Sequence, residues 1–305
     1  MFIGNINTIP SIVNLPGQRN VSSDLGAAYA FQVARGNWFE AVFNSALGKI
    51  DNIAISCWIK IDASFFVPPT NPTSDKESHI VDKFSSTTVG GYRLFLRHRG
   101  ADVTPGGGQI QLVFQATGPG TSPVKTLILT LPTSGQNEIK ANTVYLVTAD
   151  HVGDNVPVAA NGSIRLRGAN GVSLNKTTTD FSITEIGDGF PPFVIGNANP
   201  TTATKGFAGA IDEVALWSDS TQINSASADR LFNWPVYKDL MNSDPLGEGS
   251  KPENWFRMGE NTTENGGVLT MPNVGRVNTN LTLTTDSNIT PLPTKVSGLP
   301  NELYA

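Results

Sequence analysis

The chain of 305 residues contains one cysteine, Cys57, and only three histidines, His79, His98 and His151. One cysteine cannot form an intramolecular disulfide or supply a cysteine-based zinc site. The histidines lie far apart in the sequence, which argues against a catalytic zinc site as well. The sequence therefore predicts a protein that depends neither on disulfides nor on zinc.

Charge and long apolar segments are also scarce. Charged residues make up 15% of the chain and the formal net charge is −5, whereas proteins that bind the nucleic-acid backbone neutralise phosphates with a basic surface. No run of about 18 apolar residues occurs, as a membrane-spanning helix would need. The start, MFIGNINTIP, lacks the basic and apolar regions of a signal peptide. We therefore expect no nucleic-acid partner, no membrane insertion, and synthesis in a reducing cytoplasm.

Residues that form turns are abundant, with 30 Gly and 20 Pro among many Thr, Asn and Ser. This composition suits many strands joined by polar turns better than long helices. Short apolar or alternating runs recur between clusters of turn residues, as in a β-sandwich. These runs are 52–61, 79–84, 92–97, 109–116, 125–131, 144–150, 163–167, 193–196 and 210–217. We therefore predict an all-β fold.

Alternation within the runs assigns one side of each strand to the core and the other to water or a partner. Tyr92, Leu94 and Leu96 share the inward side of one strand, and Ile164 and Leu166 that of another. The outward side chains are then mostly arginines. In the functional interpretation they dock an acidic neighbouring subunit or an anionic glycan; in the alternative they guard a solvated sheet against aggregation. The candidate residues for binding a partner or a glycan are Arg93, Phe95, Arg97, Arg99, Arg165 and Arg167.

Three parts of the chain differ in pattern. Residues 1–28 lack a sustained period, which predicts an extended N-terminal arm, and residues 29–242 carry the runs of the predicted sandwich. Residues 218–233 hold the one short helix that we expect, which Pro235 ends. Its N-cap candidates are Ser218, Asp219 and Ser220. Residues 243–305 are rich in Gly, Ser and Pro and then in Thr and Asn, which predicts an extended C-terminal arm.

The order of the runs and two motifs carry a family resemblance. Residues 55–60 read Ile-Ser-Cys-Trp-Ile-Lys, and residues 207–217 read Phe-Ala-Gly-Ala-Ile-Asp-Glu-Val-Ala-Leu-Trp before a short helix. In these features the chain resembles the laminin-G-like jelly roll of the concanavalin-like superfamily, although Val144 and Leu146 replace the Trp and His that are usual there. The resemblance covers roughly two-thirds of the chain and implies a sandwich of two antiparallel sheets, but no particular activity, because this fold hosts lectins, adhesion modules, hydrolases and structural domains.

Asp212 lies in the closing motif and shares parity with Val214 and Leu216, the expected core face. The resemblance implies that Asp212 is a ligand of a structural calcium ion. In the alternative interpretation its carboxylate accepts hydrogen bonds from loop amides. No Asp-x-Asp-x-Asp-Gly loop accompanies it, which favours the alternative. We expect no other cofactor.

The catalytic pattern of this fold is missing from the sequence. Glycoside hydrolases of the fold carry two glutamates and an aspartate at alternating positions of one strand. The nearest pair here is Glu185 and Asp188, and the glycines beside them predict a turn. We therefore predict a protein that is not an enzyme.

Residues 254–260, Asn-Trp-Phe-Arg-Met-Gly-Glu, precede a Thr- and Asn-rich end, and this arrangement is similar to virion proteins of tailed phages, marine and cyanobacterial ones among them. The resemblance implies a non-enzymatic virion protein, either a capsid decoration (cement) protein or a tail or fibre component, held by its terminal arms. Its expected partners are other virion proteins and further copies of itself, and its expected location is the virion. The alternative is a lectin-like host-recognition module that binds a surface glycan. Sugars stack on exposed aromatic rings, and the candidate rings are Trp38, Trp217, Trp234 and Trp255.

Overall fold

The computed structural model describes residues 29–33, 37–41, 52–84, 90–118, 123–153, 161–181, 183, 186, 192–198, 203–218, 223–233, 239–247, 249–259, 262–276, 282–285, 292–297 and 299. The predicted N-terminal arm, residues 1–28, lies outside them, and so do Glu185, Asp188 and Trp234. In the described part of the chain no helix is long and apolar enough to cross a membrane.

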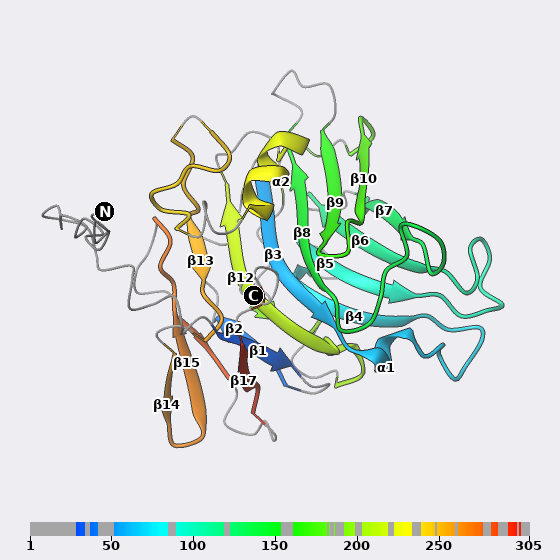
Figure 1. The fold of residues 1–305 in the computed structure, drawn as a ribbon, viewed down its shortest axis with the longest axis horizontal. Coiled ribbons are helices and arrows are strands. Elements are labelled where there is room, and N and C mark those ends of the chain that lie inside the picture. The colour runs from blue at the N-terminus through cyan, green and yellow to red at the C-terminus, as the bar shows by residue number, and fades with distance from the viewer. Residues whose placement is uncertain are drawn as a thin grey trace, which may run out of the picture.

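Two antiparallel sheets pack face to face, and sheet A is the nearer one in Figure 1. Each run predicted from the sequence falls on a strand of one of the sheets. Sheet A has the strand order β10 (Ser173–Thr178), β9 (Gly162–Gly168), β8 (Val144–His151), β3 (Ile53–Ile61), β12 (Gly209–Trp217), β1 (Tyr29–Val33) and β17 (Thr294–Ser297), and β13 (Asn254–Phe256) also pairs with β12.

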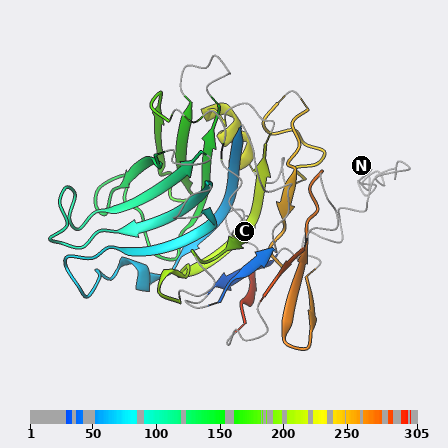
Figure 2. The same ribbon diagram turned by 180° about the vertical axis from the view of Figure 1, so that it is seen from behind.

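Sheet B is nearer the viewer in Figure 2. Its strand order is β14 (Thr263–Asn265), β15 (Val268–Pro272), β16 (Thr282–Thr284), β2 (Phe39–Ala41), β11 (Phe193–Ile195), β4 (Lys76–Phe84), β5 (Gly91–His98), β6 (Ile110–Thr117) and β7 (Lys125–Leu131). The predicted all-β sandwich of two antiparallel sheets is therefore confirmed.

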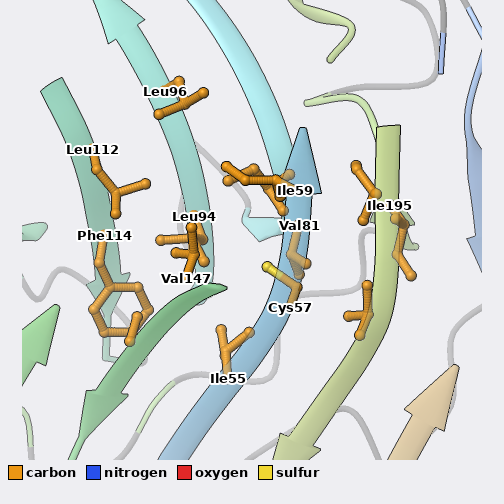
Figure 3. Packing of buried hydrophobic residues seen from close by; sticks show 14 of the residues in the cluster. Ile55, Cys57, Ile59, Val81, Leu94, Leu96, Leu112, Phe114, Val147 and Ile195 are labelled. Atoms are coloured by element: carbon orange, nitrogen blue, oxygen red, sulfur yellow. The ribbon is translucent and has the colours of Figure 1, made fainter. Parts of the chain in front are cut away.

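The main core fills the space between the sheets. Ile55, Cys57 and Ile59 alternate along β3 and face Leu94 and other apolar residues of sheet B (Figure 3). Burying a large apolar side chain stabilises a fold by about 1.5–3 kcal/mol. Because one residue in two points inward along a strand, the alternation in the sequence is sufficient to predict this core.

A second apolar layer covers the other face of sheet A. The helix α2 (Ser225–Phe232) lies on it, and Leu231 is buried there together with Trp58 and Trp217. Asn224 caps the helix, since its side chain accepts a hydrogen bond from Ser227 N at 2.9 Å. The sequence prediction put the helix start several residues too early: β12 continues to Trp217, and the chain needs a connection before it can turn back over the sheet.

A second short helix, α1 (Ala63–Phe66), was not predicted. Asp62 caps it and accepts a hydrogen bond from Ser64 N at 2.8 Å. Four residues are too few to show a helical period, so only the capping residue could have indicated it. Figure 1 shows α1 at the side of the sandwich away from β13, β14 and β15.

The described residues after 243 include five strands, β13, β14, β15, β16 and β17. β13 pairs with β12, β17 with β1, and β16 with β2. These three pairings join segments that lie far apart in the sequence, so no local pattern indicates them. β14 and β15 instead form a hairpin around Gly266 and Gly267, a turn that the sequence could have indicated. The domain boundary at residue 243 remains a prediction.

Candidate functional site

The arginines singled out in the sequence lie on two different sheets. Arg93 and Arg97 lie on β5 of sheet B, and Arg165 and Arg167 lie on β9 of sheet A. Since the core separates the two sheets, the six candidate residues do not form one surface.

Arg165 and Arg167 contact the chain segment that covers sheet A. Nη1 of Arg165 donates to the carbonyl oxygen of Ile223, just before α2, and also contacts Ser163 and Asp150. Arg167 forms an ion pair with Asp229 of α2, and its guanidinium lies 5.4 Å from the ring centroid of Phe232. These two arginines therefore help to hold α2 on the sheet.

Asp150 lies in the same covered layer and is 1% exposed. Burial raises its pKa to about 7, although the hydrogen bond from Ser163 and the charge of Arg165 act in the opposite direction. The raised pKa thus results from enclosure beneath the α2 segment.

On sheet B, Phe95 faces outward without being exposed. Its ring stacks on His79, with 4.6 Å between the centroids and an angle of 6° between the planes. The guanidinium of Arg93 lies 5.1 Å from the centroid of Phe95 and 4.5 Å from that of Phe84. Phe95 therefore packs within the polar layer and is not free to stack on a ligand.

A chain of charged groups runs along β4 beside this ring. Nε2 of His79 lies 3.2 Å from Glu77, and Nδ1 lies 2.9 Å from Asp82. Nζ of Lys205, in the 3₁₀ helix η2 (Ala203–Lys205), lies 2.8 Å from Glu77. Burial alone would raise the pKa of Glu77, but the hydrogen bonds and charges of His79 and Lys205 outweigh burial and hold it at about 2. Burial raises the pKa of Asp82 despite its contact with His79.

Asp75, just before β4, contacts the two remaining candidate arginines. Its carboxylate oxygens lie 3.1 Å from Nε of Arg99 and 3.8 Å from Nε of Arg97. Arg97 also donates two hydrogen bonds to Oε1 of Gln111, at 3.0 and 2.7 Å. The predicted residues Arg97 and Arg99 are thus brought together around one carboxylate.

Asp75 and Glu77 line a pocket with a cavity volume of about 640 Å³. The pocket lies between the segment that follows α1 and the residues of η2. Its lining residues are Ser64, Val67, Pro68, Pro69, Thr70, Asp75, Lys76, Glu77, Thr204 and Lys205. Most of them could not be predicted from the sequence, because they belong to an aperiodic loop and to a distant turn that meet only in the fold. The run Val67-Pro68-Pro69, which exposes 61% of Val67, is the local signal that could have indicated an exposed apolar wall.

The pocket has one apolar side and one charged side. Val67 and the two prolines offer C–H surface, while Lys205, Glu77 and Asp75 offer hydrogen-bonding groups. In contrast, Trp38, Trp217 and Trp255 are at most 7% exposed. Among the described tryptophans, therefore, the rings considered for stacking on sugars are used for packing.

The structure places Asp212 differently from the sequence prediction. The pairing of β12 with β3 is irregular between Asp212 and Ala215, where Glu213 has a φ of 52°. This bulge reverses the alternation, so Asp212 does not share the core side of Val214. Its carboxylate accepts hydrogen bonds from the backbone amides of Glu213, at 2.9 Å, and Leu299, at 3.1 Å.

These hydrogen bonds agree with the interpretation of Asp212 as a carboxylate that binds amides. Within the described residues no group of three or more His, Cys, Asp or Glu side chains could hold a metal ion. The role of Asp212 as a ligand of a structural calcium ion stays a prediction.

Comparisons with known proteins give likenesses of structure only. No family profile matches the sequence, and no curated protein is similar to it. A proposed carbohydrate binding protein from Bacteroides ovatus is 14% identical and superimposes with a TM-score of 0.50, over 89% of this chain and 60% of its own. The SAP-like pentraxin of Limulus polyphemus is 11% identical, with a TM-score of 0.41 over 65% of this chain and 79% of its own. Tailspike protein 2 of bacteriophage CBA120 is 11% identical, with a TM-score of 0.42 over 78% of this chain and 34% of its own.

The likeness to the Bacteroides protein concerns the fold. Together with the two antiparallel sheets, it agrees with the predicted all-β sandwich fold. The chain spans 60% of the length of that protein.

Proposed function

We propose that this chain is a lectin-like, non-enzymatic module that binds carbohydrate in the pocket between α1 and η2. The pocket itself is the observation that carries the proposal. It combines an apolar wall, formed by Val67, Pro68 and Pro69, with charged groups that donate and accept hydrogen bonds. A sugar ring presents the matching combination of C–H faces and hydroxyl edges, and such amphipathic recognition is typical of ligand sites.

The fold agrees with this proposal without proving it. The Bacteroides ovatus protein that shares this fold is described as a proposed carbohydrate binding protein. Because one fold hosts many functions, the proposal rests on the pocket and takes only support from this likeness.

The state of the pocket carboxylates favours binding over hydrolysis. A glycoside hydrolase needs one carboxyl group with a raised pKa as the acid and a second carboxylate as base or nucleophile. The pKa of Glu77 is instead held at about 2, and Asp75 contacts Arg97 and Arg99. We therefore expect no release of reducing ends when the protein is incubated with a panel of polysaccharides.

A glycan array followed by substitution of the apolar wall tests the proposal. We expect the wild-type protein to bind at least one class of glycan and Val67→Asp to weaken that binding about tenfold or more, because the substitution replaces the apolar wall with a charge. An array without any bound glycan, or binding that Val67→Asp leaves unchanged, would contradict the proposal.

Val124 provides the matched control. It is the other large apolar side chain found exposed among the described residues, at 47%. The neighbouring Lys125 pairs with Ala116, and Ala116 pairs with Tyr92, whereas Lys76 of the pocket pairs with His98 at the opposite end of β5. Val124→Asp is therefore expected to leave glycan binding unchanged.

We further propose that the module is displayed on a phage particle, as a decoration, tail or fibre component, in contact with other virion proteins and with copies of itself. The similarity of residues 254–260 to virion proteins supports this setting. Mass spectrometry of purified particles and immunogold labelling with antibodies against the chain test it, and absence of the chain from the particles would contradict it.

A further inference from the structure

Positive charge exceeds negative charge around the pocket, although the whole chain has a net charge of −5. Lys76 and Lys205 line the pocket together with Asp75 and Glu77, so these four charges cancel. Arg97 and Arg99, which contact Asp75 from outside the lining, add two positive charges. The six groups therefore carry a formal net charge of about +2.

Both carboxylates of the pocket already have cationic or N–H partners. Asp75 lies between Arg97 and Arg99 and also accepts a hydrogen bond from Gly100 N at 3.4 Å. Glu77 lies between His79 and Lys205. The pKa of Glu77, at about 2, keeps this carboxylate ionised and paired at neutral pH. A ligand therefore meets carboxylates whose charge is balanced by their neighbours.

The cations differ in how well a ligand can reach them. Lys76 donates to the carbonyl oxygens of Ser64 and Val67, at 2.5 and 3.0 Å, which directs its amine toward the loop. The side chains of Arg97 and Arg99 are 15% and 12% exposed, whereas that of Lys205 is 40% exposed. An ammonium group has three N–H donors, so Lys205 can hold Glu77 and donate to a ligand as well.

We infer that the pocket selects acidic saccharides, those that carry carboxylate or sulfate groups, and that Lys205 contacts the anion. Arg97 and Arg99, which contact Asp75, make the electrostatic potential in the pocket more positive. Their effect reaches the ligand because charges in a partly enclosed site are screened less than charges on an open surface. This inference rests on the proposed carbohydrate binding and adds the class of ligand to it.

Binding measurements with matched acidic and neutral oligosaccharides test the inference. The probes are an oligouronate with its carboxyl-reduced counterpart, and a sulfated oligosaccharide with its desulfated counterpart. We expect at least one acidic member to bind about tenfold or more tightly than its neutral counterpart, and added salt to reduce this difference. The two pairs also distinguish a carboxylate ligand from a sulfate ligand.

Substitution of Lys205 tests whether this residue is responsible for the preference for acidic probes. Lys205→Gln is expected to weaken binding of the acidic probe about fivefold, which is the upper end of the range for one partly exposed charge contact. Lys205→Arg keeps the charge and should keep the preference. Lys176→Gln on β10, an exposed lysine of sheet A, is the matched control and should bind as the wild type does.

The outcomes separate this inference from the proposed function. If acidic and neutral probes bind equally and Val67→Asp weakens both, the pocket binds carbohydrate and the inference of acidic selectivity is wrong. If the preference persists in Lys205→Gln, Lys205 does not contact the anion and the inference is likewise overturned. If none of the probes and no glycan on the array binds, the proposed function fails and the inference fails with it.

Discussion

Asp150 shows how one enclosed carboxyl group couples stability to pH. Its pKa is raised to about 7 by burial, against the effects of Ser163 and Arg165, whereas the pKa of an aspartate in an unfolded chain is about 3.9. As the pH rises from about 4 to 7, the unfolded chain loses this proton before the folded chain does. The folded state then binds more protons than the unfolded state, so the free energy of unfolding falls as the pH rises through this interval.

The substitution Asp150→Asn removes the titrating group and keeps the shape of the side chain. We expect urea unfolding of the wild type at pH 4.5, 6 and 7.5 to show a larger decrease in stability with pH than the same series for Asp150→Asn. The difference should be on the order of a few kcal/mol at most across the interval. Comparing the two proteins cancels the contributions of the histidines and of Glu77, whose lowered pKa acts only at more acidic pH. Parallel pH profiles would contradict the prediction.

Among the elements, α2 has the clearest separation between a buried and an exposed side. Leu231 is 3% exposed and packs in the second core with Trp58, and the ring of Phe232 stacks on Trp58 with 5.6 Å between the centroids. Ser225, on the same helix, is exposed. The helix has only eight residues, so its stability depends on this contact with sheet A rather than on helix propensity.

Leu231→Ala is therefore expected to lower the free energy of unfolding by about 2–5 kcal/mol, through lost burial and the cavity that remains. Ser225→Ala changes an exposed position of the same helix and should stay within about 0.5 kcal/mol of the wild type. Equilibrium unfolding in urea measures both. A loss for Leu231→Ala no larger than that for Ser225→Ala would show that α2 does not contribute to the second core.

The elements also show which strands can be predicted from local sequence patterns. Strands with a buried and an outward side, such as β3 and β5, follow from alternation alone. β10 has Leu174 as its one apolar residue, and β14 is polar along its length, so neither strand shows such a pattern. At Glu213 a single bulged residue with a φ of 52° inverts the alternation, and nothing in the residue types around it indicates that Asp212 leaves the core side.

At the scale of the whole molecule, contacts between distant segments determine the features that could not be predicted from the sequence. The alternation within β5 is sufficient to predict that Arg97 points outward. Its contact with Asp75, in contrast, depends on the pairing of β4 with β5. The ion pair between Lys205 and Glu77 requires a turn far along the chain to reach the same sheet. The pocket was therefore beyond a residue-by-residue prediction, although the fold class was not.

Residues beyond 243 contribute to both cores of the molecule. Phe256, Met258, Leu269 and Met271 lie in the core between the sheets. Leu246, Trp255 and Leu299 lie in the second core on the outer face of sheet A. The C-terminal segment thus completes the sandwich as well as adding strands to its sheets.

Deleting residues 243–305 tests whether this segment is part of the folding unit. Each large apolar side chain contributes about 1.5–3 kcal/mol when buried, and a native domain has a net stability of only about 5–15 kcal/mol. Removing the seven side chains named above would cost roughly 10–21 kcal/mol, which is comparable to or larger than the stability available. We expect the shortened chain to lose its cooperative thermal transition in circular dichroism and to be digested rapidly by protease.

A chain that lacks residues 1–28 is the control. These residues are predicted from the sequence to be an arm, so their deletion should leave the thermal transition cooperative. A shortened chain of residues 1–242 that unfolds cooperatively at the wild-type temperature would instead show that the C-terminal segment is dispensable for folding, as an arm would be.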